Sequence, residues 1–284
     1  MSMLNAIYWD KDPIFFRVLG YEMHYYTLCF MLAFLVSYII MLRVFNREGK
    51  SQELLDQLSI YIFVGTLLGA RLGHCLFYEF DYYKDHLLEM FLPIAFVDGG
   101  IRLTGFHGLA SHGGAIGILT AMFLFCRKTK VDFMWLADRL VIVVAIAGAF
   151  IRLGNFFNSE IIGLPADLPW AVIFARVDAI PRHPAQLYEA IAYVSIFIML
   201  VLIYQKSKAL KPGFMFGLFM ITLFGARFGL EFLKENQEAF EEGMRLNMGQ
   251  LLSIPFMLIG VYFVARKKDP PPLPPPSKAS TARR

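Results

Sequence analysis

The segment RLGNFFNSEIIG, from Arg152 to Gly163, places one guanidinium, two side-chain amides and one carboxylate at the end of a long apolar run. If the run is helical, Arg152, Asn155 and Ser159 fall roughly on one stripe of the helix. Ionisable groups are costly at membrane depth, and they usually face a bundle interior or a wet cavity and mark function. The segment is therefore a candidate functional site.

Other apolar runs also contain ionisable residues. These are Arg71 and His74 near Leu54–Tyr78, His112 at the start of SHGGAIG, and Arg227 and Glu231 in Gly213–Leu233. Arg227 and Glu231 are four residues apart, so they share a helix face and the glutamate can orient the guanidinium. Three arginines exceed what the nearby glutamates neutralise, which indicates an anionic ligand. Planar guanidinium groups suit phosphate.

The composition places these residues in a membrane protein. Of 284 residues, 57% are hydrophobic and 18% charged, whereas soluble domains carry about a quarter charged residues. We predict an all-α polytopic protein with seven transmembrane helices, because runs of about 20 apolar residues must satisfy their own backbone in lipid. The predicted spans are Tyr25–Leu42, Leu54–Tyr78, Leu109–Cys126, Trp135–Ser159, Gln186–Tyr204, Gly213–Leu233 and Met248–Ala265.

Basic residues follow every second span and give the orientation. The clusters are Arg43, Arg47 and Lys50; Arg127, Lys128 and Lys130; Lys206, Lys208 and Lys211; and Arg266, Lys267 and Lys268. The positive-inside rule places these loops in the cytoplasm, so the N-terminus is outside and the C-terminus inside. The first span is expected to be retained, because the N-terminus lacks the order of a cleaved signal peptide.

With this orientation, most of the intramembrane polar residues lie at the outer ends of six spans; Asp138 and Arg139 are the exceptions. We therefore predict one transmembrane domain over residues 1–266 with an outward-facing polar chamber, followed by a basic, proline-rich cytoplasmic tail over 267–284. An anion at the level of the outer leaflet is most simply a phospholipid headgroup. The expected partners are therefore the lipid bilayer around the helices and a phospholipid from it.

Several classes of site are not expected. The three cysteines, Cys29, Cys75 and Cys126, lie in apolar runs and show neither a disulfide framework nor metal-ligand spacing. We expect no metal, no cofactor and no nucleic-acid partner. A transporter or flippase of an anionic lipid or small anion also uses intramembrane arginines, but no inverted repeat or pair of interrupted helices is apparent. A receptor-like seven-helix protein explains a one-sided chamber poorly.

Eight motifs in fixed order suggest a family. They are HYYTL at His24, GARLGHCLFY at Gly69, DGG at Asp98, SHGGAIG at Ser111, RLGNFFNSEIIG at Arg152, PRHPAQLYE at Pro181, RFGLEF at Arg227 and MGQLLSIP at Met248. Over residues 13–266 the chain closely resembles the bacterial prolipoprotein diacylglyceryl transferases. The pattern at 152–163 matches the family signature.

The resemblance implies an enzyme of the bacterial inner membrane that needs no cofactor. Such enzymes move the diacylglyceryl group of phosphatidylglycerol to the lipobox cysteine of a prolipoprotein signal peptide and release glycerol phosphate. It implies catalytic roles for His112, Arg152 and Arg227. The implied substrate-binding residues are Arg152, Tyr26, Asn155, Glu160, Gly163 and Glu231, and the spacing of the polar residues adds Arg71. On this hypothesis, the two site arginines hold the phosphate, Asn155 and Glu160 position the glycerol, and His112 assists thiol deprotonation.

Three positions depart from the family pattern. Ile151 replaces the usual glycine before the signature arginine, and Leu223 replaces a frequent tyrosine four residues before Arg227. An extra segment resembling TGFHGLA brings in His107 as a second candidate histidine. The HGG motif and the helix start favour His112.

The alternating basic loops give a testable topology. In a cysteine-less background, single cysteines at Lys50 and Lys208 should be shielded from an impermeant thiol reagent in intact cells, whereas one at Lys84 should react. Labelling of the Lys50 position from outside would reverse the orientation, and with it the outer-leaflet chamber.

Overall fold

The computed structural model describes residues 6–18, 21–92, 94–97, 100–103, 108, 110–207, 210–236, 241 and 243–267. Asp98 and Gly99 of the DGG motif, His107, Lys208 and the tail at 268–284 lie outside the described residues. The chain forms two compact units. The first unit comprises residues 1–41 and 137–284, and the second comprises residues 42–136.

Seven long helices coincide with the seven apolar runs. They are α1 (Tyr25–Arg47), α2 (Gln52–Phe77), α5 (Ser111–Thr129), α6 (Phe133–Asn158), α7 (Ala185–Lys206), α8 (Phe214–Leu230) and α9 (Met248–Ala265). Among the described residues, six segments are long and apolar enough to cross a membrane: α1, α2, α6, α7, α9, and α8 together with the following 3-10 helix η2 (Glu231–Leu233). The protein is thus a multi-pass membrane protein.

The helix α5 is the predicted span that is not among these six. It begins with Ser111 and His112, and Arg127 and Lys128 lie in its last turn. The uncharged stretch from Gly113 to Cys126 is only 14 residues long. At 1.5 Å per residue it spans about 21 Å, whereas the hydrocarbon core of a bilayer is about 30 Å thick. A count of seven transmembrane helices remains a prediction.

Short strands, which the sequence analysis did not predict, accompany the helices. In the first unit, β1 (Ile7–Trp9), β6 (Val172–Phe174) and β7 (Pro181–Arg182) form one sheet in the order β1-β6-β7, with β1 parallel and β7 antiparallel to β6. The strands β2 (Ile14–Val18) and β3 (Tyr21–His24) form an antiparallel pair. In the second unit, β4 (Ile94–Val97) pairs antiparallel with β5 (Gly100–Leu103).

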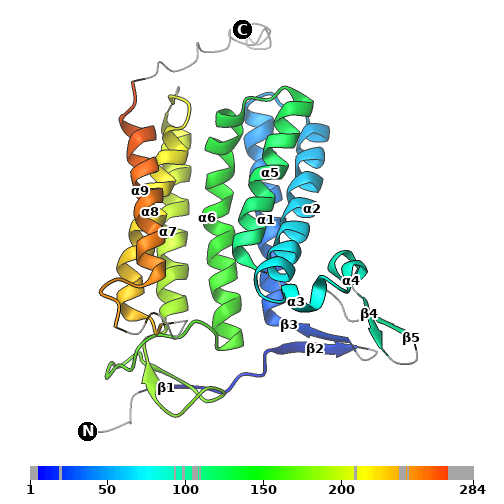
Figure 1. Ribbon diagram of the computed structural model, residues 1–284. Coiled ribbons are helices and arrows are strands. Elements are labelled where there is room, and N and C mark those ends of the chain that lie inside the picture. The colour runs from blue at the N-terminus through cyan, green and yellow to red at the C-terminus, as the bar shows by residue number, and fades with distance from the viewer. Residues whose placement is uncertain are drawn as a thin grey trace, which may run out of the picture. The chain divides into compact units, whose positions relative to one another are not determined.

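The core of the first unit lies between α6, α7 and α8, which run side by side in Figure 1. Buried residues such as Ala145, Leu200 and Phe219 pack there. A second cluster joins Phe156 at the end of α6 to Val172 and Phe174 of β6. This packing places the small sheet against the end of α6 that carries Arg152.

Asp138, one of the two polar residues that the chamber did not explain, has a structural role. Its carboxylate accepts hydrogen bonds from the backbone N–H groups of Gly213 (2.7 Å) and Phe216 (2.9 Å). These are donors at the start of α8 that have no partner within their own helix. Asp138 therefore caps α8 from α6.

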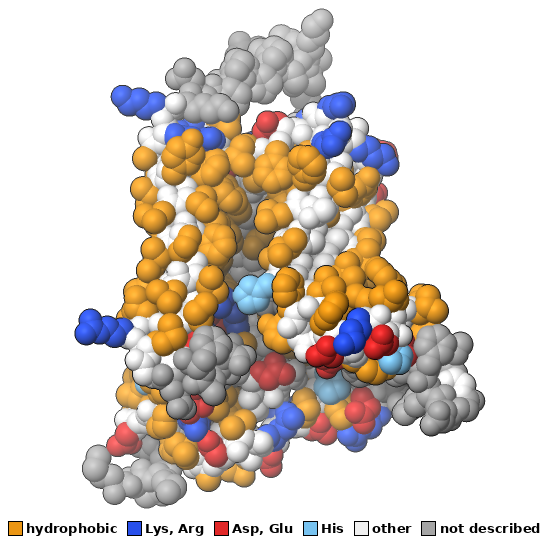
Figure 2. Space-filling view, in the orientation of Figure 1, with side chains coloured by type: hydrophobic (Ala, Val, Ile, Leu, Met, Phe, Trp, Pro, Cys, Tyr) orange, Lys and Arg blue, Asp and Glu red, His pale blue; other side chains and the backbone are white. Residues whose placement is uncertain are grey.

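The sides of the long helices are apolar. Figure 2 shows hydrophobic side chains along the middle of the helices, with charged side chains mostly toward their ends. Large apolar residues such as Leu35, Ile191 and Leu258 are more than half exposed. Burial against lipid explains this exposure, since a soluble protein rarely exposes so much contiguous apolar surface.

In the second unit, α2 and α5 pack through glycines and lie side by side (Figure 1). A methyl group added at Gly113 would come 2.2 Å from the carbonyl oxygen of Gly69 and 2.8 Å from the Cα of Gly73. One added at Gly117 would come 2.0 Å from the carbonyl oxygen of Gly65. Close helix packing thus explains these glycines.

Gly113→Ala should destabilise the protein because its methyl group would meet backbone atoms of α2. The neighbouring Gly114→Ala is the matched control, since its methyl group would lie at an ordinary 3.6 Å from the Cβ of Ala70. Overpacking costs about 1–3 kcal/mol, so we expect a Tm several degrees lower for Gly113→Ala and little change for Gly114→Ala. Thermal denaturation of the purified proteins in detergent measures this. Equal Tm values would contradict the packing role.

Candidate active site

The site begins where α6 ends. The helix stops at Asn158 because Ser159 has a left-handed backbone with φ +57°, and Ile161 repeats this at φ +56°. Such a conformation is a genuine outlier for a β-branched residue and costs about 1–3 kcal/mol. Strain of this kind persists where the surrounding structure imposes it, often at functional sites. Glu160 lies between the two strained residues.

Amide groups hold Glu160. Its carboxylate accepts hydrogen bonds from Asn155 Nδ2 (3.2 Å) and Asn158 Nδ2 (3.0 Å). Its backbone carbonyl accepts a hydrogen bond from Gln186 Nε2 at 2.6 Å, and Gln186 is fully buried in α7. Among the described residues no cation pairs with this carboxylate. Glu160 can therefore accept a hydrogen bond from a ligand.

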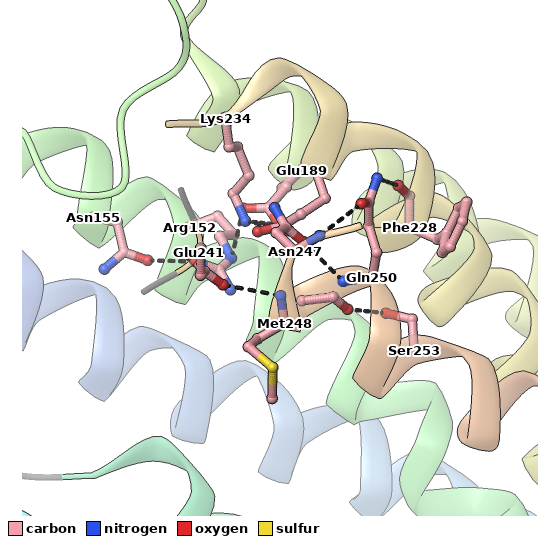
Figure 3. Close-up of polar contacts among 12 residues, drawn as sticks. Arg152, Asn155, Glu189, Phe228, Lys234, Glu241, Asn247, Met248, Gln250 and Ser253 are labelled. Carbon is pink, nitrogen blue, oxygen red and sulfur yellow. Dashed lines mark hydrogen bonds and ion pairs between the residues drawn. The ribbon is translucent and has the colours of Figure 1, made fainter. Parts of the chain in front are cut away.

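Arg152 is held in place from three sides. Its Nε lies 3.0 Å from Glu189 Oε2, and its Nη1 donates to Asn155 Oδ1 at 3.2 Å (Figure 3). Tyr193 also hydrogen-bonds to the guanidinium. The Arg152 side chain is 14% exposed and Glu189 is fully buried. A guanidinium has five N–H donors, so N–H groups remain for a further acceptor.

Glu231 pairs with a lysine and not with the predicted arginine. Its Oε2 lies 2.8 Å from the Nζ of Lys234, which is also 3.4 Å from Glu189 Oε1. The expected pairing of Glu231 with Arg227 was wrong, because the η2 turn places Lys234 three residues further on in direct contact with the carboxylate. Gly249 of α9 lies against the same carboxylate.

Arg227 differs from the other cations of the site. It is half-buried in α8 and forms no hydrogen bond or ion pair with any residue that the structure describes. It lies within electrostatic range of Tyr193, the residue that hydrogen-bonds to Arg152. Both arginines therefore belong to one cluster, and Arg227 has an unused guanidinium there.

Tyr26 belongs to the same cluster. At the start of α1, its ring lies against Gly154 of α6, where an added methyl group would come 2.8 Å from the ring. Its hydroxyl lies within electrostatic range of Glu160 and Arg152. Gly154 thus allows Tyr26 to approach the site.

Gly163 lies where three backbone segments meet. Its N–H donates to the carbonyl of His183 (3.1 Å), and it forms a β-bridge with Lys234. An added methyl group would come 2.4 Å from the His183 oxygen and 2.8 Å from the Leu233 oxygen. The position therefore requires glycine for packing.

An ion-pair network supports this junction from outside the helices. Arg182 is buried, contacts Glu235, and donates to the carbonyl of Gly163 at 3.2 Å. Its Nη2 also donates to Asp178 at 2.6 Å. These hydrogen bonds hold the pKa of the Asp178 carboxyl below its usual range, so Asp178 stays ionised across the physiological pH range.

The remaining predicted residues belong to the second unit. The Arg71 guanidinium donates to Tyr83 Oη (3.0 Å) and to the carbonyls of Glu89 (2.7 Å) and Met90 (3.3 Å). It thereby ties α2 to the short helices α3 (Phe80–Tyr83) and α4 (Leu87–Phe91). His112 lies exposed in the first turn of α5.

Comparisons with known proteins identify the family. The family model for prolipoprotein diacylglyceryl transferase matches residues 13–266. The chain belongs to this family. Three relatives named phosphatidylglycerol–prolipoprotein diacylglyceryl transferase come from Bacteroides fragilis, Tolumonas auensis and Chloroherpeton thalassium. The first is 46% identical over 93% of this chain and 96% of its own length. The second is 45% identical over 91% of this chain and 96% of its own length. The third is 42% identical over 93% of this chain and 95% of its own length.

In the cluster of this diacylglyceryl transferase, Lys234 is a residue that was not predicted from the sequence. Lys234 directly follows the sixth predicted apolar span and looked like an ordinary flanking charge. Its position three residues after Glu231 was the available signal, because residues at that spacing are neighbours on a helical turn. Gln250, a buried polar residue of the last predicted span, completes a capping box with Asn247 at the start of α9.

Proposed function

We propose that this chain transfers the diacylglyceryl group of phosphatidylglycerol to the lipobox cysteine of a prolipoprotein signal peptide. The observation that carries the proposal is the family match over residues 13–266 together with a buried cluster in which Arg227 has no carboxylate partner among the described residues. The site faces the outer leaflet of the bacterial inner membrane. The chain crosses this membrane seven times, with the N-terminus outside and the C-terminus in the cytoplasm.

The reaction is a displacement at an sp3 carbon. The cysteine sulfur forms a bond to the terminal glycerol carbon of the diacylglyceryl group, and the bond from that carbon to the phosphate oxygen breaks. The products are a thioether and glycerol phosphate, and the thiol proton leaves with a base. Negative charge grows on the phosphate as it departs, so fixed guanidinium groups in a water-poor site lower the barrier.

The site residues divide this work. Arg152, oriented by Glu189 and Asn155, and Arg227, which has no carboxylate partner in the described chain, bind the phosphate. The Glu160 carboxylate, held by Asn155 and Asn158, accepts hydrogen bonds from the glycerol hydroxyls. Tyr26, Gly163 and Glu231 complete the binding site, and Arg71 is a further candidate phosphate ligand. No cofactor is required for this chemistry.

A groove on the first unit suits the apolar part of such a substrate. It has a volume of about 510 Å³ and an almost wholly apolar lining, which includes Ala192 of α7 and Gly225, Ala226 and Gly229 of α8. Ala226 directly precedes Arg227 in the chain. A lipid whose phosphate contacts Arg227 can therefore extend an acyl chain along this groove.

His112 has a separate proposed role. A free thiol has a pKa of about 8.5 and is mostly protonated at neutral pH, so a base assists the attack. We propose that His112 is this base. Arginine is not an ordinary base because it keeps its proton at this pH.

Purified protein, phosphatidylglycerol and a cysteine-bearing precursor peptide should yield a peptide heavier by one diacylglyceryl group. Arg152→Lys and Arg227→Lys keep the charge but lose the planar fork, so we expect turnover to fall about 100-fold, as for the loss of charge-assisted hydrogen bonds. The exposed Arg43→Lys is the control and should leave turnover unchanged. Near-normal turnover in both site variants would exclude the arginines as phosphate ligands. A wild-type protein that yields no product would favour the transporter alternative.

His112→Gln should lower turnover at neutral pH by about 100-fold, the usual scale of proton-transfer assistance. Binding of phosphatidylglycerol should persist, because both arginines remain. Turnover should recover in part at alkaline pH, where the peptide thiol ionises without help. The measurement is turnover of wild type and variant from about pH 6 to 9.5. A variant that binds lipid and is equally impaired at every pH would remove His112 as the base.

A further inference from the structure

Lys234 is the most deeply buried cation of the active-site cluster. Its side chain is 1% exposed, and its Nζ lies 2.8 Å from Glu231 Oε2 and 3.4 Å from Glu189 Oε1. The two carboxylates come from different elements, Glu231 from η2 and Glu189 from α7. A compact ammonium group with three donors suits a position between two carboxylates.

Glu189 connects this lysine to the arginine of the family signature. One of its oxygens lies 3.0 Å from Arg152 Nε, and the other faces Lys234 (Figure 3). Neither oxygen has a hydrogen-bond partner of good geometry among the described residues. The position of Glu189 therefore depends on electrostatic attraction from both cations.

The backbone of Lys234 is fixed at the same place. Lys234 forms a β-bridge with Gly163, and the N–H of Glu235 donates to the carbonyl of Ile162 at 3.3 Å. This pairing joins Lys234 to the segment that directly follows Glu160. The backbone of Lys234 is thus held by the segment after Glu160, and its side chain is held by Glu231 and Glu189.

We propose that Lys234 is a positioning residue that keeps the two site arginines available for phosphate. The inference rests on the proposed function. Arg152, Glu189, Lys234 and Glu231 form a row of alternating charges with no net charge. Without Lys234, two buried carboxylates face only guanidinium groups, and they compete with the phosphate of the lipid for Arg152 and Arg227. Lys234 acts through these neighbours and need not touch the substrate.

The proposal predicts a specific effect of pH. In Lys234→Met, a buried carboxyl loses its cation, which raises its pKa. Below that pKa the carboxyl is neutral and leaves the arginines free; above it the carboxylate is ionised and competes with the substrate. We therefore expect kcat/KM for phosphatidylglycerol to fall at least 10-fold at alkaline pH, with a smaller loss at acidic pH. A lysine that served only packing would give the same loss at every pH.

Charge balance provides the second variant. In Lys234→Met combined with Glu231→Gln, one cation and one carboxylate are both removed, so the row is again without net charge. The loss of kcat/KM should be smaller than the product of the losses in the two single variants. Residues with independent roles would give losses that multiply. If Lys234→Met alone does not fold, the double variant takes its place: because its row of charges is again neutral, its kcat/KM should stay within about 10-fold of wild type, and a larger loss would overturn the role of Lys234.

Two controls complete the experiment. Lys206→Met, at the exposed far end of α7, should match wild type at every pH. Lys234→Arg keeps a cation at the site and should show no acid-favoured profile. A wild type that forms no diacylglyceryl peptide overturns the proposed function. An active wild type, with Lys234→Met losing activity equally across pH and the double-variant losses multiplying, overturns the role of Lys234 alone.

Discussion

The buried ion pair between Arg152 and Glu189 is the interaction on which the rest of the site depends. A charge removed from water is costly unless it is paired and hydrogen-bonded, and removing one partner leaves the other uncompensated. Glu189 is fully buried in α7, and Arg152 is 14% exposed in α6. The pair therefore fixes the relative positions of these two helices at the site. It also requires a second cation, Lys234, since Glu189 has two oxygens in an apolar helix bundle.

This requirement explains the backbone around the site. Lys234 reaches Glu189 only if the chain after α8 returns to the end of α6, and Gly163 allows that return because any side chain would meet the backbone of His183 and Leu233. The left-handed residues Ser159 and Ile161 turn the chain between α6 and this junction. The strained turn and Gly163 together allow the alternating charges of Arg152, Glu189, Lys234 and Glu231 to be buried next to one another. The sheet of β1, β6 and β7 packs against the same end of α6 through Phe156 and Phe174.

The sequence predicted the helices well because a long apolar run in lipid has few alternatives to a helix. Met248–Ala265 was predicted with the same bounds that the structure gives. The strands were missed because three to five residues outside the apolar runs carry little periodic signal. Contacts between elements were also beyond reach: helical spacing suggested that Glu231 pairs with Arg227, whereas the η2 turn gives it Lys234.

The two arginines of the site are therefore not equivalent, although the sequence treats them alike. Arg152 is held by a carboxylate, an amide and a tyrosine, so its orientation is set before any ligand arrives. Arg227 has no such partners among the described residues and keeps its donors for a ligand. Preorganised donors stabilise developing charge without reorganisation, whereas an unpaired cation gives affinity for an anion that is already present. In a displacement that releases a phosphate, the first property suits the transition state and the second suits the bound lipid. In the proposed mechanism, the carboxylates around Arg152 and Lys234 keep these two tasks separate, because they pair with those two cations and leave Arg227 without a counter-ion in the described chain.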